Sequence, residues 1–218
     1  MSRERVLELI RIALRGGGAS DEGAAAAGAS GAPVDLPVLP PPQVFDDPVA
    51  LFVERARQVG VTVEVVASME EAGMRAVAWC AQRAVRRAAV WHTADLAPVL
   101  ALVQAGGVGM LAPDTSLDVL AQADAGITGA DWGIAETATL VLGSAPGQPR
   151  MASLLPPVHL AILRADRIVA DLPALFARLG PMPSALTFIT GPSRSADVGL
   201  KPVLGAHGPT EVAVLLVR

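Results

Sequence analysis

Apolar residues recur along the chain at two spacings, which together predict alternating helices and strands between residues 47 and 123. One helical spacing follows Asp46 and Asp47, either of which could be the N-cap, with Pro48 in the first turn, and another follows Ser68, also a good N-cap residue. Short runs of small or β-branched apolar residues between the helices predict strands. The expected elements alternate from helix to strand, over Asp47–Gln58, Val61–Val66, Ser68–Ala84, Ala88–Trp91, Asp95–Gln104, Val108–Leu111 and Ser116–Ala123.

The second half of the chain is dominated by strand patterns and has one clear helical pattern, at Asp171–Leu179. Helix–strand alternation in the first half predicts a parallel sheet with helices on its faces. Strands that follow one another directly predict that antiparallel strands join this sheet and make it mixed. We therefore expect an α/β fold. The strands expected in this half are Ala125–Gly129, Thr137–Gly143, Val158–Leu163, Ala185–Thr190 and Val212–Val217.

The first 45 residues are expected to form an appendage to the α/β domain, which we place at residues 46–218. Residues 1–15 have the apolar spacing of an amphipathic helix. Residues 16–45 are rich in glycine and alanine and then in proline, as in a flexible linker that stiffens toward its end. The apolar stripe of the N-terminal helix needs a partner, which is either this domain or another chain.

Composition and charge exclude several classes of protein. The net charge is −4 and no long block of lysine or arginine is present, so we expect no nucleic-acid partner. Cys80 is the single cysteine, which excludes a disulfide framework, a cysteine-rich zinc site and an iron–sulfur cluster held by this chain alone. No pair of histidines has the spacing of metal ligands, so we expect no bound metal.

Neither a membrane span nor an export signal is expected. The apolar stretch Ala94–Pro113 is interrupted by Pro98 and by three glycines, and it is better explained as a helix, a turn and a strand. The N-terminus carries charges of both signs and lacks the apolar core of a signal peptide. These features predict a cytoplasmic protein.

The first stretch that could carry chemistry is Gly126–Thr139, where an apolar strand ends in a turn that contains Asp131. Ligands of open α/β sheets bind beyond the carboxyl ends of the strands. Glu136 is a candidate general base or nucleophile, and Asp131, Thr137 and Thr139 are candidates for substrate binding. Within one strand Thr137 and Thr139 face away from Glu136, so a shared pocket requires a bulge or a strand that begins later. Alternatively, Asp131 caps a turn and Glu136 forms an ion pair.

The second stretch, Phe188–Asp197, leads from an apolar strand into a turn of small residues. The backbone N–H groups of such a turn and the Arg194 guanidinium suit an anion, either a carboxylate or a phosphate. If the turn is helical, Asp197 could hold Arg194 in place. Alternatively, Ser193 caps a helix and Arg194 lies on the surface. The candidate anion-binding residues are Gly191, Ser193, Arg194, Ser195 and Asp197.

The third stretch, Gly205–Pro209, places His207 between small residues in a loop before the last strand. Small neighbours leave the imidazole accessible for proton transfer, so His207 joins Glu136 as a candidate catalytic residue. A structural role for this histidine is the alternative. Neither a G-x-G-x-x-G motif after the first strand nor a P-loop motif is present, which argues against a dinucleotide enzyme and a P-loop NTPase.

These stretches resemble the LUD-domain family and, within it, the lactate-utilisation protein C group (LutC-like proteins). The resemblance covers about residues 47–218, and it is specific because several motifs occur in the family's order. The family usually has glycine where Ala138 stands. The resemblance implies a Rossmann-like sheet of the NagB/RpiA/CoA-transferase group, mostly parallel, with helices on both faces and added antiparallel strands. The motifs are Ile134–Val141 (IAETATLV), Ser153–His159 (SLLPPVH), Thr190–Asp197 (TGPSRSAD) and Gly205–Pro209 (GAHGP).

The resemblance implies a cluster-free subunit or accessory protein of a system that oxidises L-lactate to pyruvate. Its partners would be the iron–sulfur proteins of that system, and its ligand a small anion bound at the carboxyl ends of the strands. No cofactor is expected in this chain alone, and iron–sulfur clusters are expected only in the partner subunits. Two alternatives stay open. One is an enzyme that acts on a phosphorylated or CoA-linked small molecule with Glu136 as nucleophile or base, and the other is a non-catalytic assembly module.

Overall fold

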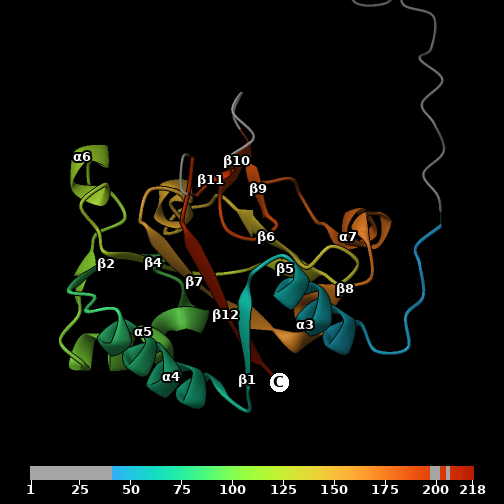
Figure 1. Cartoon of the computed structure of the whole chain (residues 1–218), viewed down its shortest axis with the longest axis horizontal. Helices are drawn as coiled ribbons and strands as arrows, with labels where there is room; N and C mark the ends of the chain where they lie inside the picture. Colours follow the sequence, from blue (N-terminus) through green and yellow to red (C-terminus); the bar gives the residue numbers. More distant parts are fainter. Residues whose placement is uncertain (1–40, 197–201, 205–206) are drawn as a thin grey trace, which may run out of the picture. The chain divides into compact units, whose positions relative to one another are not determined.

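The computed structural model describes residues 41–196, 202–204 and 207–218, which contain alternating helices and strands (Figure 1). The helix expected at residues 1–15 and the linker as far as residue 40 lie outside the described residues. None of the helices in the described part of the chain is long and apolar enough to cross a membrane. The helices are α3 (Pro48–Gln58), α4 (Met69–Gln82), α5 (Ala97–Ala105), α6 (Leu117–Leu120) and α7 (Leu172–Arg178), with short 3-10 helices η1 (Ala94–Leu96), η2 (Arg150–Ser153) and η3 (Ala165–Arg167).

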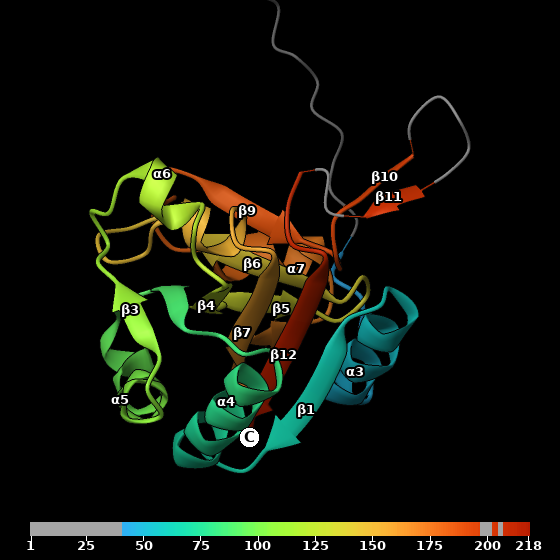
Figure 2. The same ribbon diagram turned by 60° about the vertical axis from the view of Figure 1, so that its left-hand side comes forward.

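A six-stranded sheet in which every neighbouring pair of strands is parallel forms the centre of the fold (Figure 2). Helices α4 and α5 pack against each other, and α4 contacts two strands of this sheet. The last strand of the chain lies inside the sheet and not at its edge. Across the sheet, the order is β1 (Thr62–Val66), β12 (Glu211–Val217), β7 (Val158–Arg164), β4 (Ala125–Gly129), β2 (Arg87–Val90) and β3 (Gly109–Leu111).

The predicted α/β class is confirmed, but the antiparallel strands form a second sheet and do not widen the parallel one. Gly133 in this second sheet permits a close approach, because a Cβ there would lie 2.8 Å from Leu163 Cδ2 of β7 and 3.2 Å from Phe52 Cε2 of α3. Figures 1 and 2 show α4 and α5 on the other side of the parallel sheet. The second sheet has the order β8 (Ile168–Val169), β5 (Trp132–Ile134), β6 (Thr139–Gly143) and β9 (Leu186–Ile189), and β10 (Arg194–Ala196) pairs with β11 (Pro202–Leu204) as a separate hairpin.

Helices α3 and α4 begin at the residues that the sequence predicts, and side-chain caps explain why. Asp47 Oδ1 accepts a hydrogen bond from the Ala50 amide at 2.9 Å. Ser68 Oγ accepts one from the Glu71 amide at 3.1 Å. The Glu71 carboxylate in turn accepts a hydrogen bond from the Ala67 amide at 2.8 Å, so backbone amides before and after the N-cap residue both have an acceptor.

The core lies mainly between the parallel sheet and the layers on its two faces, where Phe52, Trp91, Ile127 and Leu160 are fully buried. Cys80 on α4 belongs to this core and is 1% exposed. Burial raises the pKa of the Cys80 thiol to about 11, and the nearby Arg83 charge offsets only part of that rise. The single thiol of the chain is therefore a packing residue in the native fold.

Two glycines at the ends of β4 have different surroundings. A Cβ on Gly126 would lie 1.9 Å from the carbonyl oxygen of Ala152, whereas a Cβ on Gly129 would find its nearest atom 3.7 Å away, on the ring of Trp91. Helix η2 therefore rests directly on the amino-terminal half of β4. The carboxyl end of the same strand has ordinary space around it.

Candidate functional site

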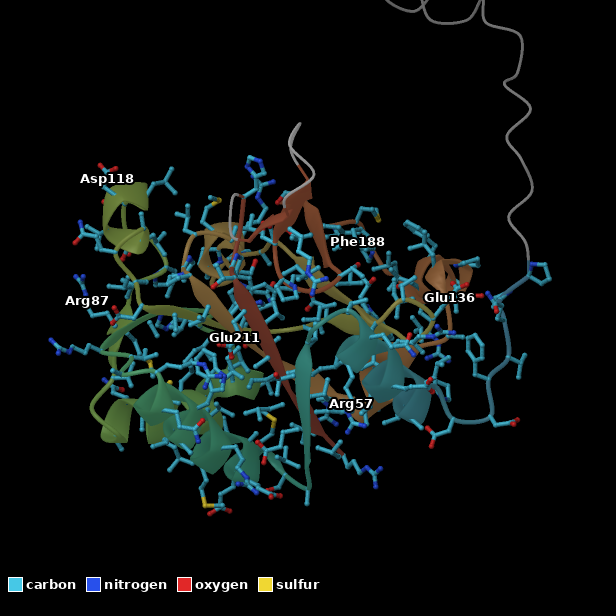
Figure 3. The ribbon with its side chains drawn as sticks, viewed as in Figure 1. Arg57, Arg87, Asp118, Glu136, Phe188 and Glu211 are labelled. Atoms are coloured by element: carbon cyan, nitrogen blue, oxygen red, sulfur yellow. The ribbon has the colours of Figure 1, made fainter. Side chains whose placement is uncertain are left out.

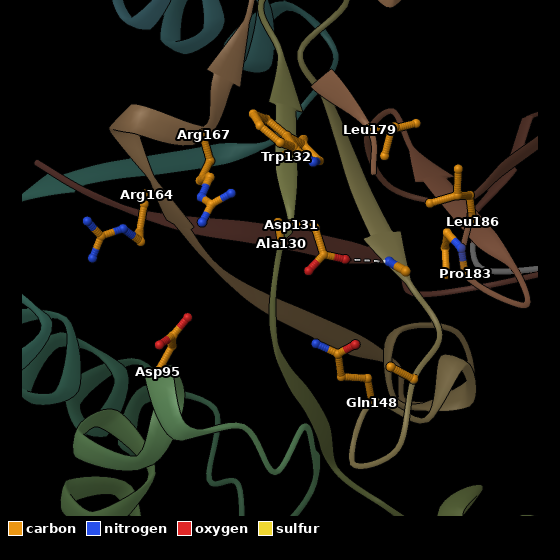
Figure 4. A pocket seen from close by; sticks show the side chains of 12 residues that line it. Asp95, Ala130, Asp131, Trp132, Gln148, Arg164, Arg167, Leu179, Pro183 and Leu186 are labelled. Carbon is orange, nitrogen blue, oxygen red and sulfur yellow. Dashed lines mark hydrogen bonds between the residues drawn. The ribbon is translucent and has the colours of Figure 1, made fainter. Parts of the chain in front are cut away.

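A cavity of about 350 Å³ lies at the carboxyl ends of β2, β4 and β7, the edge of the sheet where ligand binding is expected. Each of these strands is followed by a loop that brings polar side chains to the cavity. Asp95 lies in η1 after β2, and Asp131 follows β4 directly. Arg164 ends β7 and Arg167 lies in η3, while Gln148 comes from the loop before η2 (Figure 4). We call this space the Asp131 cavity.

Apolar side chains of the second sheet and of the chain near α7 also line the Asp131 cavity. They are Trp132, Leu179, Pro183 and Leu186. A smaller hollow of about 90 Å³ lies beside the cavity and shares Asp95, Asp131 and Arg164 with it. The cavity thus combines an apolar lining with a few polar groups, as in sites that orient a small ligand by convergent contacts.

Asp131 is held in place by the backbone of β6. Its Oδ2 accepts a hydrogen bond from the Gly143 amide at 2.6 Å, and its own amide donates to the Val141 carbonyl at 2.9 Å. Figure 4 shows the second carboxylate oxygen directed away from this bond. Burial raises the pKa of Asp131, and the Gly143 hydrogen bond and the Arg167 charge oppose that rise. The turn-capping role and the binding role considered for Asp131 are therefore compatible, since each uses a different oxygen.

The two arginines at the Asp131 cavity differ in their partners. Arg164 forms paired hydrogen bonds to Asp166, each 3.1 Å long, on the exposed surface. The Arg167 guanidinium instead stands over the ring of Trp132, 5.3 Å from its centroid. Among the described residues, no ion pair within 4.0 Å involves Arg167. Arg167 is therefore the cation whose hydrogen-bond donors remain available to a ligand at this cavity.

Ser193 and His207 meet at the other end of the parallel sheet. The Ser193 amide donates to the Pro209 carbonyl at 2.8 Å, and Ser193 Oγ accepts from the His207 amide at 3.3 Å. Thr210, next along the chain, donates its amide to the carbonyl of Pro157 at 2.8 Å. These contacts lie just before β7 and β12 begin. Ser193, His207 and Gly191 therefore surround a hollow of about 200 Å³ at the amino ends of these strands, away from the carboxyl edge where we expected the anion site.

Arg194 begins a strand, β10, so neither the helical turn nor the helix cap considered for this segment is formed. Its Nη2 donates to the carbonyl of Val59 at 3.5 Å, at the end of α3. Gly191 has a φ of +87°, and a Cβ there would lie 2.7 Å from the Val59 oxygen. This segment is therefore packed against the end of α3. Asp197 and the side chain of Ser195 lie outside the described residues.

Glu136 is exposed and lies beside the segment that leads into α3 (Figure 3). Its Oε1 accepts a hydrogen bond from Gln43 Nε2 at 2.9 Å. The chain turns after Glu136, because Ala138 has a φ of +53° and β6 starts only at Thr139. The side chain of Glu136 does not line the Asp131 cavity or the hollow beside Ser193 and His207.

A chain of hydroxyl groups links the start of β6 to the end of β9. Thr137 Oγ1 and Thr139 Oγ1 are 2.7 Å apart, and Thr139 Oγ1 is 2.7 Å from Thr190 Oγ1. The predicted shared direction of Thr137 and Thr139 is consistent with this bond. Thr139 is buried, and Thr190 lines the hollow beside Ser193. The chain of hydroxyl groups therefore lies beside that hollow and not at the Asp131 cavity.

The described ranges contain no group of three or more His, Cys, Asp or Glu side chains placed to hold a metal ion. His159 is fully buried in β7, where its Nε2 lies 2.8 Å from Thr128 Oγ1, and burial lowers its pKa to about 4. His159 is therefore neutral near pH 7, as expected of a structural histidine.

A profile of the LUD domain matches residues 49–217. The chain belongs to the LUD domain family. It is 38% identical over 113 residues to lactate utilization protein C of Exiguobacterium sp., a match that covers 49% of each chain. It is 40% identical over 104 residues to the protein of that name from Halalkalibacterium halodurans, covering 44% of this chain and 45% of that one. The chain thus spans about half the length of the curated relatives it matches.

Comparison with solved structures supports the same assignment. A crystal structure of a DUF162 family protein from Deinococcus radiodurans matches with a TM-score of 0.58 and 26% sequence identity. The match covers 78% of this chain and 96% of that one. The resemblance to the LUD-domain family inferred from the motifs is therefore confirmed for both sequence and fold.

In this LUD domain, sequence reasoning identified Asp131 but missed the residues that share its cavity. Arg164 directly follows the predicted strand Val158–Leu163, and Arg167 comes three residues later. A position at the carboxyl end of a parallel strand was therefore a usable signal. Asp95 was considered only as the first residue of a predicted helix. Gln148 lies in an irregular loop, and no local pattern places it at the cavity.

Proposed function

We propose that this LUD domain serves in lactate utilisation by binding a small organic anion, lactate or its oxidation product pyruvate, in the Asp131 cavity. The observation that carries this proposal is the Arg167 guanidinium at the carboxyl ends of the parallel strands, which forms no ion pair with the residues that the structure describes. Arginine holds a carboxylate through two parallel hydrogen bonds. The names of the related lactate utilization proteins support the choice of anion.

Partner proteins follow from the same proposal. Oxidation of lactate to pyruvate releases two electrons, and an iron–sulfur cluster that accepts them is usually held by four cysteine thiolates. With Cys80 as its single cysteine, this chain would work beside iron–sulfur proteins that take up the electrons. Its own contribution would be to hold and orient the organic acid.

The alternative of an enzyme with Glu136 as nucleophile or base has less support. Such a residue has to stand within hydrogen-bond reach of a bound substrate. Glu136 is exposed and bonded to Gln43, outside the linings of both the Asp131 cavity and the hollow at Ser193. His207 is exposed at the opposite end of the sheet from Asp131.

Calorimetric titration of the full chain with L-lactate, pyruvate, inorganic phosphate and CoA tests this proposal. Arg167→Ala and Arg194→Ala form a matched pair, because both remove an exposed arginine, each at a different end of the sheet. We expect lactate or pyruvate to bind, with affinity reduced about tenfold or more by Arg167→Ala and about twofold at most by Arg194→Ala. Binding lost only in Arg194→Ala would move the site to the amino end, and binding of phosphate or CoA alone would contradict the lactate role.

A further inference from the structure

A cation and a hydrogen-bond acceptor both line the Asp131 cavity, close enough for the Arg167 charge to act on the Asp131 carboxyl. Arg167 stands over Trp132, and Asp131 projects from the loop after β4 (Figure 4). A ligand that satisfies both needs a carboxylate and, close to it, a group that donates a hydrogen bond. A 2-hydroxy acid has these two groups on adjacent carbons.

We propose that Asp131 makes this cavity select a 2-hydroxy acid over the corresponding 2-oxo acid. This inference rests on the proposed function and adds to it the residue that sets specificity. An ionised carboxylate can only accept hydrogen bonds, so it pairs with the α-hydroxyl of lactate. The keto oxygen of pyruvate is also only an acceptor, and it would face the Asp131 oxygen without a proton between them.

The backbone of β6 fixes Asp131 in this role. The Gly143 amide binds Oδ2 at 2.6 Å, which leaves Oδ1 for a ligand. Gly143 permits this approach, because a Cβ at that position would lie 3.0 Å from Oδ2 and 3.3 Å from Pro183 Cγ. A side chain held by one oxygen keeps its direction, which is a requirement for discrimination between two ligands of nearly equal size.

Charges of both signs surround Asp131 and set when it is ionised. The Gly143 hydrogen bond and the Arg167 charge favour the ionised form, and Arg164 from the end of β7 and Asp95 from η1 also line the cavity. Gln148 is neutral. Burial has the largest effect and raises the pKa of Asp131. As the pH falls through this pKa, protonated Asp131 becomes able to donate to a keto oxygen, so the preference for the hydroxy acid declines.

The test is the ratio of the dissociation constants of pyruvate and L-lactate, measured by calorimetry with the full chain. We expect lactate to bind about tenfold or more tightly at pH 8, and the ratio to fall as the pH is lowered through the raised pKa of Asp131. Asp131→Asn can donate to a keto oxygen and should lower the ratio about fivefold or more at pH 8. Asp118→Asn, an exposed carboxylate on α6, is the charge-matched control and should leave the ratio unchanged.

The outcomes separate this inference from the function on which it rests. If both acids bind equally and at all pH values, the specificity role of Asp131 is wrong while the lactate role stands. If neither acid binds, the proposed function fails and the inference with it. If Asp131→Asn does not fold, as judged by its thermal melt, the wild-type ratio at pH 8 decides, because equal binding of the two acids overturns the role of Asp131.

Discussion

At the carboxyl ends of β2, β4 and β7 charged side chains face a cavity, whereas at the amino ends of β7 and β12 polar groups bond mainly to the chain itself. Ser193 illustrates the second case, since its amide and its hydroxyl are both used by the loop before β12. Asp131 illustrates the first, with one oxygen bound to Gly143. The capacity of each end to bind a ligand therefore depends on the polar groups that are not used in hydrogen bonds within the local structure.

The same comparison applies to Arg167 and Arg194. Arg194 reaches the carbonyl of Val59 and packs over Gly60, where a Cβ would lie 2.7 Å from its Nη2. Arg167 rests on an aromatic ring, which leaves its hydrogen-bond donors unused among the described residues. Two arginines near strand ends thus have different roles, and their sequence contexts alone do not reveal which one is available.

The largest stability difference between the two ends is expected within β4. Gly126→Ala would drive a Cβ into the Ala152 carbonyl, so we expect the free energy of unfolding to fall by about 3 kcal/mol. Gly129→Ala, the matched control at the other end, has space for the methyl group and should cost less than about 1 kcal/mol. Urea unfolding of both variants measures this difference. Equal losses of unfolding free energy in the two variants would show that η2 moves aside easily. The amino end of β4 would then not be the more tightly packed end.

A second contrast lies along β7, from buried His159 at its amino end to exposed Arg164 at its carboxyl end. The pKa of His159 is lowered to about 4 in the fold, so the unfolded chain binds the extra proton as the pH falls below about 6.5. The free energy of unfolding should therefore fall by about 2 kcal/mol as the pH is lowered from 6.5 to 4.5. Urea midpoints measured across this range should show the slope.

Two histidine variants identify the source of that slope. His159→Gln keeps a polar partner for Thr128 but cannot titrate, so its profile should be flatter than that of the wild type. His207→Gln changes an exposed histidine and should keep the wild-type slope. An unchanged slope in His159→Gln would assign the acid sensitivity to other groups.

The smallest expected effect is a gain in stability where β6 begins. Ala138 has a φ of +53°, a conformation in which glycine avoids the strain of a Cβ. Ala138→Gly should stabilise the fold by about 0.5–1 kcal/mol, whereas Ala135→Gly, at a buried position without positive φ, should destabilise it. Thermal melts of both variants provide the measurement, and a loss of stability in Ala138→Gly would contradict the strain.

Most elements could be predicted because their signals are local. N-cap residues and apolar spacing identified α3 and α4, and buried apolar runs identified β4, β7 and β12. Strands β5 and β8 were missed, since they are two or three residues long and too short to show alternation. Division into two sheets was also missed, because the partner of a strand is set by tertiary packing, such as the close contact of Gly133 with Leu163, and not by the strand's own pattern.

The candidate site was predicted only in part, for a related reason. Glu136 was grouped with Asp131 because they are close in sequence, but β5 lies between them and Glu136 does not line the Asp131 cavity. Conversely, Arg167 comes to the same cavity as Asp131 because β4 and β7 are hydrogen-bonded neighbours in the parallel sheet. Adjacency of strands that are distant in sequence is therefore the information that the residue pattern lacks.

The burial of Cys80 gives this chain an internal reporter of how often the fold opens. With a pKa of about 11 and 1% exposure, the thiol is almost entirely protonated near neutral pH and shielded from reagents. Alkylation then requires α4 to separate from the sheet. Because the chain has no other thiol, the rate of modification under native conditions counts these opening events directly, without denaturant and without an introduced label.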